Sequence, residues 1–389
     1  MRRIFFDNAA TSWPKPESVY RVVEDYLRSN GAPAGRSVYR EAGEADRIVS
    51  ETRQKMARFI GAEDLSRIVF TASGTDALNL ALQGTLRPGD HVITSVLEHN
   101  SVLRPLQALA QTRDVSVTHV PCSALGYVDP DLIQAEIRPN TKLIALIHAS
   151  NVLGTIQPIE SVGKIAQNHG VLFLIDAAQS VGYLPFDARE LSADLIAFPG
   201  HKGLLGPLGV GVLYLAPGVE DQVRSVRQGG TGTKSESLDH PASMPEKFEA
   251  GNHNVPAIAG LGAGIEFLES LDIEAQRTKH REMVDVLLAA CREIDGISSY
   301  GPDEGLDRLG VISLSMANCD VQEFASLLDA SFRIQVRSGL HCAPLAHKAI
   351  GTIASGGTVR FSFGHFNTDQ DLQILVAALN EIAPLLIKP

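Results

Sequence analysis

One lysine stands in a setting that is unusual for this residue type. Lys202 lies between an apolar run that ends at Phe198 and a glycine-rich turn over residues 203–211. Glycines let a backbone approach a ligand closely. Partial burial lowers the pKa of a lysine amine, and the neutral amine is the form that attacks a carbonyl carbon to give a Schiff base. A lysine that extends from a strand end into solvent gives the same pattern, so this fragment alone leaves both alternatives open.

A carboxylate follows a second apolar run. Asp176 comes directly after residues 171–175, and Gln179 stands three positions further on. A carboxylate at the end of a buried strand is costly unless it is paired. Pyridoxal phosphate (PLP) needs such a carboxylate beside its ring nitrogen to stay protonated as an electron sink, and Gln179 could reach the ring's phenolic oxygen. An aspartate that caps a helix is an equal alternative when the motif is taken alone.

Three more polar segments follow apolar runs. In Thr71–Asn79 a small polar turn precedes a helical pattern, so Gly74 and Thr75 could donate to a phosphate at the helix N-terminus. His99 could stack on a flat cofactor and move protons near neutral pH. Asn151 follows the next run along the chain. Capped helices and ordinary loop histidines give similar patterns singly, but five polar loops together are far more specific.

The elements that must position these residues form a parallel sheet. Several apolar runs are continuous rather than alternating, which indicates strands buried on both faces and covered by helices. Ligands bind beyond the carboxyl ends of such strands, where the polar segments lie. The predicted strands are Arg67–Thr71, His91–Val96, Val115–Val120, Leu143–His148, Val171–Ile175, Leu195–Phe198 and Val210–Leu215. The fold class is therefore α/β, with a mostly parallel seven-stranded sheet.

The two ends of the chain follow other patterns. Apolar residues at helical spacing predict helices over Pro16–Ser29 and Glu41–Ile60. From Ile258 a smaller α+β C-terminal domain is predicted. Its elements are a long helical stretch to Ile294, strands at Val311–Met316, Ile334–Arg337 and Thr358–Phe363, and helices over Val321–Phe332 and Asp369–Leu386. We expect a large PLP-binding domain over 16–260 and a small domain from 1–15 and 261–389.

Composition narrows the class of protein. The 389 residues carry a net charge of −11, with 45 acidic and 34 basic side chains, which disfavours nucleic acid as a partner. The four cysteines have no paired spacing, which argues against a disulfide framework or a metal site. The N-terminal residues lack the apolar core of a signal peptide, and no apolar run is long enough to span a membrane. We expect a cytoplasmic protein that does not bind membranes.

Taken together, the motifs resemble those of a known enzyme family. The chain is similar over nearly its whole length to class V (fold type I) PLP-dependent aminotransferases, in the cysteine desulfurase and selenocysteine lyase branch. The matching segments are Phe6–Thr11, Ser73–Thr75, Glu98–Asn100, Ser150–Gly154, Asp176–Gln179, Gly200–Lys202, Phe248–Gly251, Arg337–Pro344 and Val359–Ser362.

The resemblance implies a role for each site residue. Lys202 would hold PLP as a Schiff base and then act as the base at the substrate α-carbon, with Asp176 paired to the pyridinium. Gln179 and Asn151 would bond the ring oxygen and the substrate carboxylate region, and His99 would stack on the ring. The phosphate would be held by Gly74, Thr75 and His201. Arg360 would bind the substrate α-carboxylate, which suits its fork of donors.

Cys342 would accept the sulfur of PLP-bound L-cysteine as a persulfide and release alanine. Independently of the family, Cys342 lies near Arg337 and His341 in sequence, and cationic neighbours favour the nucleophilic thiolate. We interpret Cys122, Cys291 and Cys319 as structural thiols. The short stretch from Cys342 to Arg360 resembles group II (SUF-type) desulfurases, which often need a protein sulfur acceptor.

Three positions depart from the family pattern. Pro199 stands where relatives carry Ser or Thr, and it offers neither a hydroxyl nor an N–H to a phosphate. Asn252 replaces a threonine that reaches the neighbouring subunit's phosphate, although its amide can still donate. Tyr39 stands where relatives often have His. These changes predict weaker phosphate anchoring.

Three functions remain open at this point. The first is a cysteine desulfurase that supplies sulfur for iron–sulfur clusters or other thio-cofactors. The second is a selenocysteine lyase or a related PLP lyase or transaminase, which would not require Cys342. The third is a non-catalytic PLP-binding scaffold in sulfur trafficking, against which the intact Lys202, Asp176, His99 and Arg360 argue. The resemblance also implies a homodimer with active sites near the interface.

Overall fold

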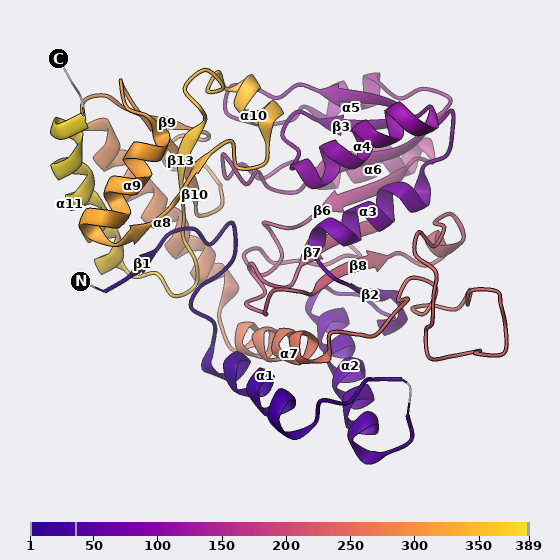
Figure 1. The fold of residues 1–389 in the computed structure, drawn as a ribbon. Coiled ribbons are helices and arrows are strands. Elements are labelled where there is room, and N and C mark those ends of the chain that lie inside the picture. The colour runs from indigo at the N-terminus through magenta and orange to yellow at the C-terminus, as the bar shows by residue number, and fades with distance from the viewer. Residues whose placement is uncertain (1, 36, 387–389) are drawn as a thin grey trace.

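A seven-stranded sheet forms the centre of the protein, as a computed structural model describing residues 2–35 and 37–386 shows (Figure 1). Its strand order is β2-β8-β7-β6-β5-β3-β4. Only the β8 pairings with β7 and β2 are antiparallel, so the sheet is mostly parallel, as predicted. The strands are β2 (Ile68–Thr71), β3 (His91–Ser95), β4 (Ser116–Val120), β5 (Thr141–Ile147), β6 (Leu172–Asp176), β7 (Leu195–Pro199) and β8 (Gly211–Leu215).

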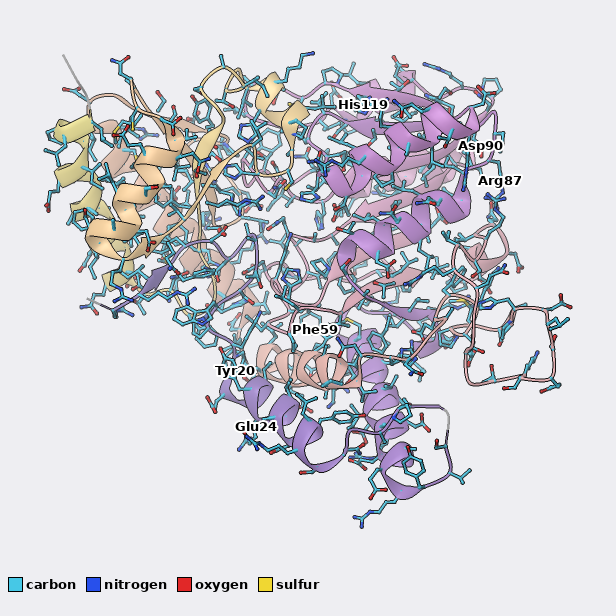
Figure 2. All side chains as sticks on the ribbon, viewed as in Figure 1. Tyr20, Glu24, Phe59, Arg87, Asp90 and His119 are labelled. Carbon is cyan, nitrogen blue, oxygen red and sulfur yellow. The ribbon has the colours of Figure 1, made fainter. Side chains whose placement is uncertain are left out.

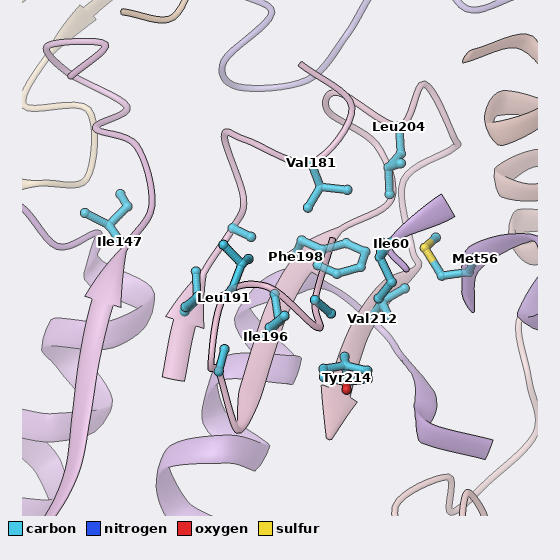
Figure 3. Packing of buried hydrophobic residues seen from close by; sticks show 14 of the residues in the cluster. Met56, Ile60, Ile147, Val181, Leu191, Ile196, Phe198, Leu204, Val212 and Tyr214 are labelled. Carbon is cyan, nitrogen blue, oxygen red and sulfur yellow. The ribbon is translucent and has the colours of Figure 1, made fainter. Parts of the chain in front are cut away.

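Helices cover both faces of this sheet, which explains the continuous apolar runs. Adjacent strand residues point to opposite faces. In β5, Leu143 packs in a core cluster with residues of α3 and α4, whereas Ile144 packs in another with residues of α2, α6 and α7. Figure 3 shows part of the second cluster, with Phe198 of β7 near Ile60 at the end of α2. The helices are α1 (Glu17–Ser29), α2 (Arg40–Phe59), α3 (Gly74–Thr85), α4 (Asn100–Arg113), α5 (Pro130–Ala135), α6 (Ile159–His169) and α7 (Val255–Glu269).

In helix α1, the spacing of apolar residues matches the side of the helix that is buried. Val19 and Tyr26 are buried on the side that contacts α7, and the Tyr26 hydroxyl donates to the carbonyl of Ala32. Figure 2 shows Tyr20 and Glu24 on the outer side of the same helix, where Tyr20 is 45% exposed. No helix among the described residues is both long and apolar enough to cross a membrane.

The C-terminal part is built on a separate four-stranded sheet of order β12-β13-β10-β9. Strand β1 (Ile4–Phe5) joins this part by pairing with β11 (Ile334–Gln335), and Figure 1 shows it beside the C-terminal elements. This pairing joins residues 4–5 to the C-terminal elements, and the division of the chain into a large and a small domain stays a prediction. The other elements are α8 (Ile273–Arg292), β9 (Ile297–Tyr300), β10 (Val311–Met316), α9 (Val321–Phe332), β12 (Arg337–Gly339), α10 (Pro344–Ala349), β13 (Thr358–Ser362) and α11 (Asp369–Leu386).

The expected long helix from Ile258 is in fact two helices. The chain leaves α7 after Glu269, and Asp272 caps α8 by accepting a hydrogen bond of 3.0 Å from the Ala275 N–H. Capping satisfies backbone donors that a continuous helix would have used internally, and it therefore fixes the break. The predicted strand at Ile334–Arg337 is likewise divided between β11 and β12, which belong to different sheets.

A buried ion pair ties the segment before α7 to the sheet. The Arg53 guanidinium donates to both carboxylate oxygens of Glu249, at 2.7 and 2.9 Å, and the Phe70 N–H donates to the same carboxylate at 2.6 Å. Both charged side chains are almost fully buried. A buried pair that loses one partner leaves an uncompensated charge, which is more costly than the pair's own net contribution.

We therefore expect Glu249→Gln to lower the free energy of unfolding by about 3–5 kcal/mol. The change is measured by urea unfolding of the cofactor-free protein. The control is Glu24→Gln, which removes an exposed helix pair with Arg28, and we expect it to cost no more than about 0.5 kcal/mol. Equal effects of the two substitutions would show that the Arg53–Glu249 pair contributes little.

Candidate active site

A cavity of about 200 Å³ lies at the carboxyl ends of the central strands. It brings together nine of the predicted site residues. Eight lie at or just after the carboxyl ends of β2, β3, β5, β6 and β7, and the ninth, Arg360, comes from β13 of the C-terminal sheet. The nine are Gly74, Thr75, His99, Asn151, Asp176, Gln179, His201, Lys202 and Arg360. The strands place the first eight at one edge because parallel strands share the direction of their carboxyl ends.

Lys202 and Asp176 are ionisable residues of opposite charge that line the cavity. Removal of the Lys202 amine from water lowers its pKa from 10.5 to about 8; the charge of Asp176 opposes this change, and those of Arg360 and Arg337 add to it. Burial raises the pKa of Asp176, whose carboxylate accepts a 3.0 Å hydrogen bond from the Ala178 N–H. Asp176 is 2% exposed, so a cationic partner in the cavity would stabilise its charged form.

The N-terminus of α3 forms one wall of the cavity. Ser73 caps the helix by accepting a hydrogen bond from the Asp76 N–H, which leaves the Gly74 and Thr75 amides as unused donors of the first turn. A side chain at Gly74 would lie 2.9 Å from the ring of Pro199, and one at Gly211 would collide with Ser73. These close contacts fix the helix end against β7 and β8. We call the Gly74 and Thr75 amides with the Thr75 hydroxyl the anion seat.

His99 is held in one tautomer by its own helix. It is the N-cap of α4, and its Nδ1 accepts the Ser101 N–H at 3.0 Å. The neutral ring therefore carries its proton on Nε2. Burial lowers the pKa of His99 to about 4, and the charges of Lys202, Arg337 and Arg360 add to this effect. His99 is neutral at physiological pH and has one donor, Nε2–H, to offer.

Arg360 is buried and already has a carboxylate partner. It is 1% exposed, its Nη2 lies 2.5 Å from Asp7 Oδ1, and its Nη1 donates to the Asn151 carbonyl at 3.1 Å. The Nε atom is buried without a hydrogen-bond partner, and so is Asn151 Oδ1. Unpaired buried polar atoms are costly, so both atoms are positions at which a polar ligand group would be stabilised.

Cys342 lies beside the cavity and contacts a residue that lines it. Arg337 is part of the cavity wall, and its Nη2 donates to Cys342 Sγ at 3.1 Å. The Cys342 carbonyl accepts the Asn100 N–H at 2.7 Å, which ties the cysteine to the start of α4. Of the two neighbours expected to be cationic, only Arg337 is charged, because burial strongly lowers the pKa of His341.

The remaining predicted residues have partners of their own. The Gln179 side-chain amide donates to the Ala9 carbonyl at 3.0 Å, and His201 Nδ1 lies 3.0 Å from the Thr11 hydroxyl. Asn252 is not part of this cavity. It lines a second cavity of the same chain, together with Glu249. Tyr39 is the N-cap of α2 and is 49% exposed.

Two residues that contact the predicted site residues were not themselves predicted. Asp7 pairs with Arg360, and Ser101 contacts both His99 and Thr75. Asp7 lies inside a segment that carries the family resemblance, so that signal could have identified it. Ser101 had no comparable signal beyond its place next to His99.

The donor set fits PLP. An amine with a lowered pKa can take the aldehyde, a buried carboxylate can pair with a pyridinium, and the anion seat can take a phosphate. The unpartnered Asn151 Oδ1 and Arg360 Nε lie in residues of the same cavity wall and leave polar capacity for a bound amino acid.

Comparison with known proteins agrees with this geometry. The family model for class V aminotransferases matches residues 4–375. A probable cysteine desulfurase of Methanothermobacter thermautotrophicus is 37% identical, over 98% of this chain and 94% of that protein. The apo structure of a cysteine desulfurase from Thermococcus onnurineus superimposes with a TM-score of 0.93 at 34% identity, covering 99% of this chain and 95% of that one. The cysteine desulfurase CsdA of Escherichia coli gives a TM-score of 0.89 at 30% identity, covering 99% of this chain and 96% of that one. The chain therefore belongs to the class V aminotransferase family, among the PLP-dependent cysteine desulfurases.

Proposed function

We propose that this chain converts L-cysteine to L-alanine and takes the sulfur onto Cys342 as a persulfide. The observation that carries the proposal is the hydrogen bond from Arg337, in the cavity wall, to Cys342 Sγ. A guanidinium at 3.1 Å stabilises a thiolate at the edge of a cavity that contains a lysine amine and a carboxylate. L-cysteine and the Cys342 thiol give L-alanine and the Cys342 persulfide, so atoms and electrons balance without another reactant.

Three residues would bind the cofactor and assist its chemistry, namely Lys202, Asp176 and His99. PLP, when bound, supplies an electron sink for the carbanion formed at the substrate α-carbon. Asp176 would keep the ring nitrogen protonated, and His99 would lie against the ring and donate from Nε2. The neutral Lys202 amine would take the PLP aldehyde and, once substrate has replaced it there, would move the proton at the α-carbon.

Arg360 and Cys342 would act on the substrate itself. The Arg360 guanidinium would bind the α-carboxylate, with Nε as its unused donor. The Cys342 thiolate would attack the substrate sulfur, so that a sulfur–sulfur bond forms as the bond from sulfur to the β-carbon breaks. The β-carbon would then take a proton to become a methyl group, and L-alanine would be released. Gln179 and Asn151 would bond the ring oxygen and the carboxylate region.

The segment after Cys342 supports a likeness to group II (SUF-type) enzymes. It contains the short helix α10, and His347 Nδ1 lies 2.7 Å from the Thr352 hydroxyl, so the segment is internally bonded. A cysteine on such a segment cannot carry sulfur far. We therefore infer that a protein sulfur acceptor approaches Cys342, in a route to iron–sulfur clusters or other thio-cofactors.

A homodimer would place Asn252 to act on the neighbouring subunit. Asn252 is exposed and lines no part of the PLP cavity of its own chain. Its amide can donate to the partner's phosphate, as the family pattern implies. Size measurement of the PLP-loaded protein tests this assembly.

The central test is turnover of L-cysteine by the PLP-loaded protein. With a thiol reductant we expect equal amounts of alanine and sulfide; without one, we expect alanine to stop after one equivalent per site, with an added sulfur on Cys342 in the mass spectrum. L-selenocysteine is compared under the same conditions. A PLP-loaded protein that forms no alanine from L-cysteine, even with candidate acceptor proteins present, would exclude the desulfurase function.

Replacement of Pro199 by serine is expected to raise the affinity for PLP. It lines the cavity beside Gly74 but has no hydroxyl and no N–H. We expect Pro199→Ser to bind PLP about tenfold more tightly, as one added hydrogen bond to a charged phosphate would allow. Pro199→Ala is the matched control, because it relaxes the backbone without adding a hydroxyl. Equal PLP dissociation constants for wild type and Pro199→Ser, measured by equilibrium binding to the apo-protein, would show that this position does not limit phosphate anchoring.

A further inference from the structure

Ser101 lies between the anion seat and His99. Its hydroxyl oxygen is 2.8 Å from Thr75 Oγ1 and 2.9 Å from His99 Nδ1, and the residue is 7% exposed in the cavity wall. Two residues contact the anion seat: Pro199 packs against Gly74, and Ser101 contacts Thr75. Pro199 has no hydrogen-bond donor, whereas Ser101 has a hydroxyl.

The Ser101 hydroxyl has one proton and two possible acceptors, which are the Thr75 oxygen and His99 Nδ1. His99 Nδ1 has a single in-plane lone pair, which already receives the Ser101 N–H at 3.0 Å. When the seat holds no anion, the Thr75 hydroxyl can donate to Ser101, and the Ser101 proton then goes to Nδ1 as a second donor.

An anion at the seat reverses the direction of the hydrogen bond between the Thr75 and Ser101 hydroxyls. The Thr75 proton turns toward the anion, because hydrogen bonds to a charged acceptor are the stronger ones. A lone pair of Thr75 then becomes free to accept the Ser101 proton. His99 Nδ1 is left with the backbone N–H alone, so occupancy of the seat changes the hydrogen bonding of the ring that would lie against the cofactor.

We propose that Ser101 is a positioning residue that couples the anion seat to His99, and that its hydroxyl strengthens phosphate binding through Thr75. The inference rests on the proposed function, because the anion is taken to be the phosphate monoester of PLP. Ser101 acts through Thr75 and His99 rather than on the reacting atoms.

The test uses the apo-protein with inorganic phosphate, so it does not depend on turnover. Histidine labelled with ¹⁵N reports on each ring, and the His99 signals are identified by their loss in His99→Gln. Phosphate binding is measured separately by calorimetry. His201 lines the same cavity but bonds to Thr11, so its signals report the direct effect of the anion's charge.

In wild type we expect phosphate to shift the His99 Nδ1 signal. In Ser101→Ala we expect about tenfold weaker phosphate binding and, at saturation, loss of the His99 Nδ1 shift with retention of the His201 shift. Ser101→Thr keeps the hydroxyl and should restore both properties. Thr75→Val removes the other end of the chain and should also abolish the His99 response. Ser116→Ala, on exposed β4, serves as the remote control.

Two outcomes would overturn the inference, and they are distinguishable. If phosphate binds wild type and Ser101→Ala equally and shifts His99 Nδ1 equally in both, Ser101 couples nothing, and the proposed function stands. If phosphate neither binds to wild type nor shifts any histidine signal, the anion seat itself fails, and the phosphate-holding part of the proposed function fails with it.

Discussion

Lys202→Ala is expected to abolish covalent capture of PLP and to lower turnover of L-cysteine by roughly 10³-fold or more, because it removes both the carbonyl-attacking amine and the base at the α-carbon. Among the described residues, Lys202 is the one lysine that lines the cavity of about 200 Å³. The measurement is mass spectrometry after borohydride reduction, together with the visible absorption of the bound cofactor and an alanine assay.

The lowered pKa of Lys202 adds a pH dependence to this prediction. With a pKa of about 8 rather than 10.5, about a tenth of the amines are neutral at pH 7, against fewer than about one in a thousand for an ordinary lysine. The rate of PLP capture by the apo-protein should therefore rise about tenfold per pH unit below pH 8 and level off above it. A rate that keeps rising toward pH 10 would contradict the lowered pKa.

Lys15 is the matched control for the same experiment. Burial lowers its pKa to about 8 as well, but its Nζ donates to the Ser12 hydroxyl at 2.7 Å and the His201 carbonyl at 2.8 Å, and it does not line the cavity. Because the two amines have similar pKa values but only Lys202 lines the cavity, the comparison separates the effect of a lowered pKa from the effect of position. Pyridoxyl modification should occur on Lys202 and not on Lys15; modification of both would show that basicity alone selects the amine.

The fold follows from local sequence signals more completely than the site does. All seven predicted strands of the central sheet are present. Six of them are buried along almost their whole length, which requires apolar runs such as residues 143–147, whereas β4 is partly exposed. Helices α9 and α11 also have the predicted bounds. The break between α7 and α8 was missed, although Asp272 before Ile273 and Glu274 is the kind of N-cap that marks a helix start.

The position of the site was predictable because strand direction is a property of the whole sheet. Asp176 ends β6, whereas Lys202, His99 and Asn151 follow three other strands, and a parallel sheet brings all four to the same end of the strands. The residue types then indicated which chemistry this end of the sheet could perform. The resemblance to a known family was still needed to choose PLP over other ligands, because each motif alone also fits a structural role.

The pairings inside the site had no local signal. Arg360 and Asp7 are 353 positions apart, and the hydrogen bond from Asn151 to the His341 carbonyl joins positions 190 apart. Such contacts join segments that are far apart in the sequence and meet through the packing of the whole chain, which periodicity and spacing do not report. Burial also changed one expectation, because His341 lies next to Cys342 in sequence but is 2% exposed and neutral.

Cys342→Ala is expected to lower alanine formation from L-cysteine by roughly 10²–10⁴-fold while leaving PLP capture by Lys202 unchanged. The substitution removes the sulfur to which Arg337 donates, whereas Lys202 itself lines the cavity and is retained. Alanine, sulfide and the cofactor spectrum are measured side by side for both proteins. Arg337→Met keeps the thiol but removes its cationic donor, and it should slow alanine formation less than Cys342→Ala does.

Cys122 supplies the control for thiol loss in general. Burial raises the pKa of the Cys122 thiol, so it stays protonated, and Cys122→Ala should retain wild-type turnover. L-selenocysteine separates the two enzyme functions that the sequence left open, because the selenocysteine lyase alternative would not require Cys342. If Cys342→Ala loses activity on L-cysteine and keeps it on L-selenocysteine, Cys342 serves sulfur transfer and the shared chemistry lies in Lys202. If the variant makes alanine from L-cysteine at the wild-type rate, sulfur leaves the substrate without Cys342, and the chain acts as a lyase instead.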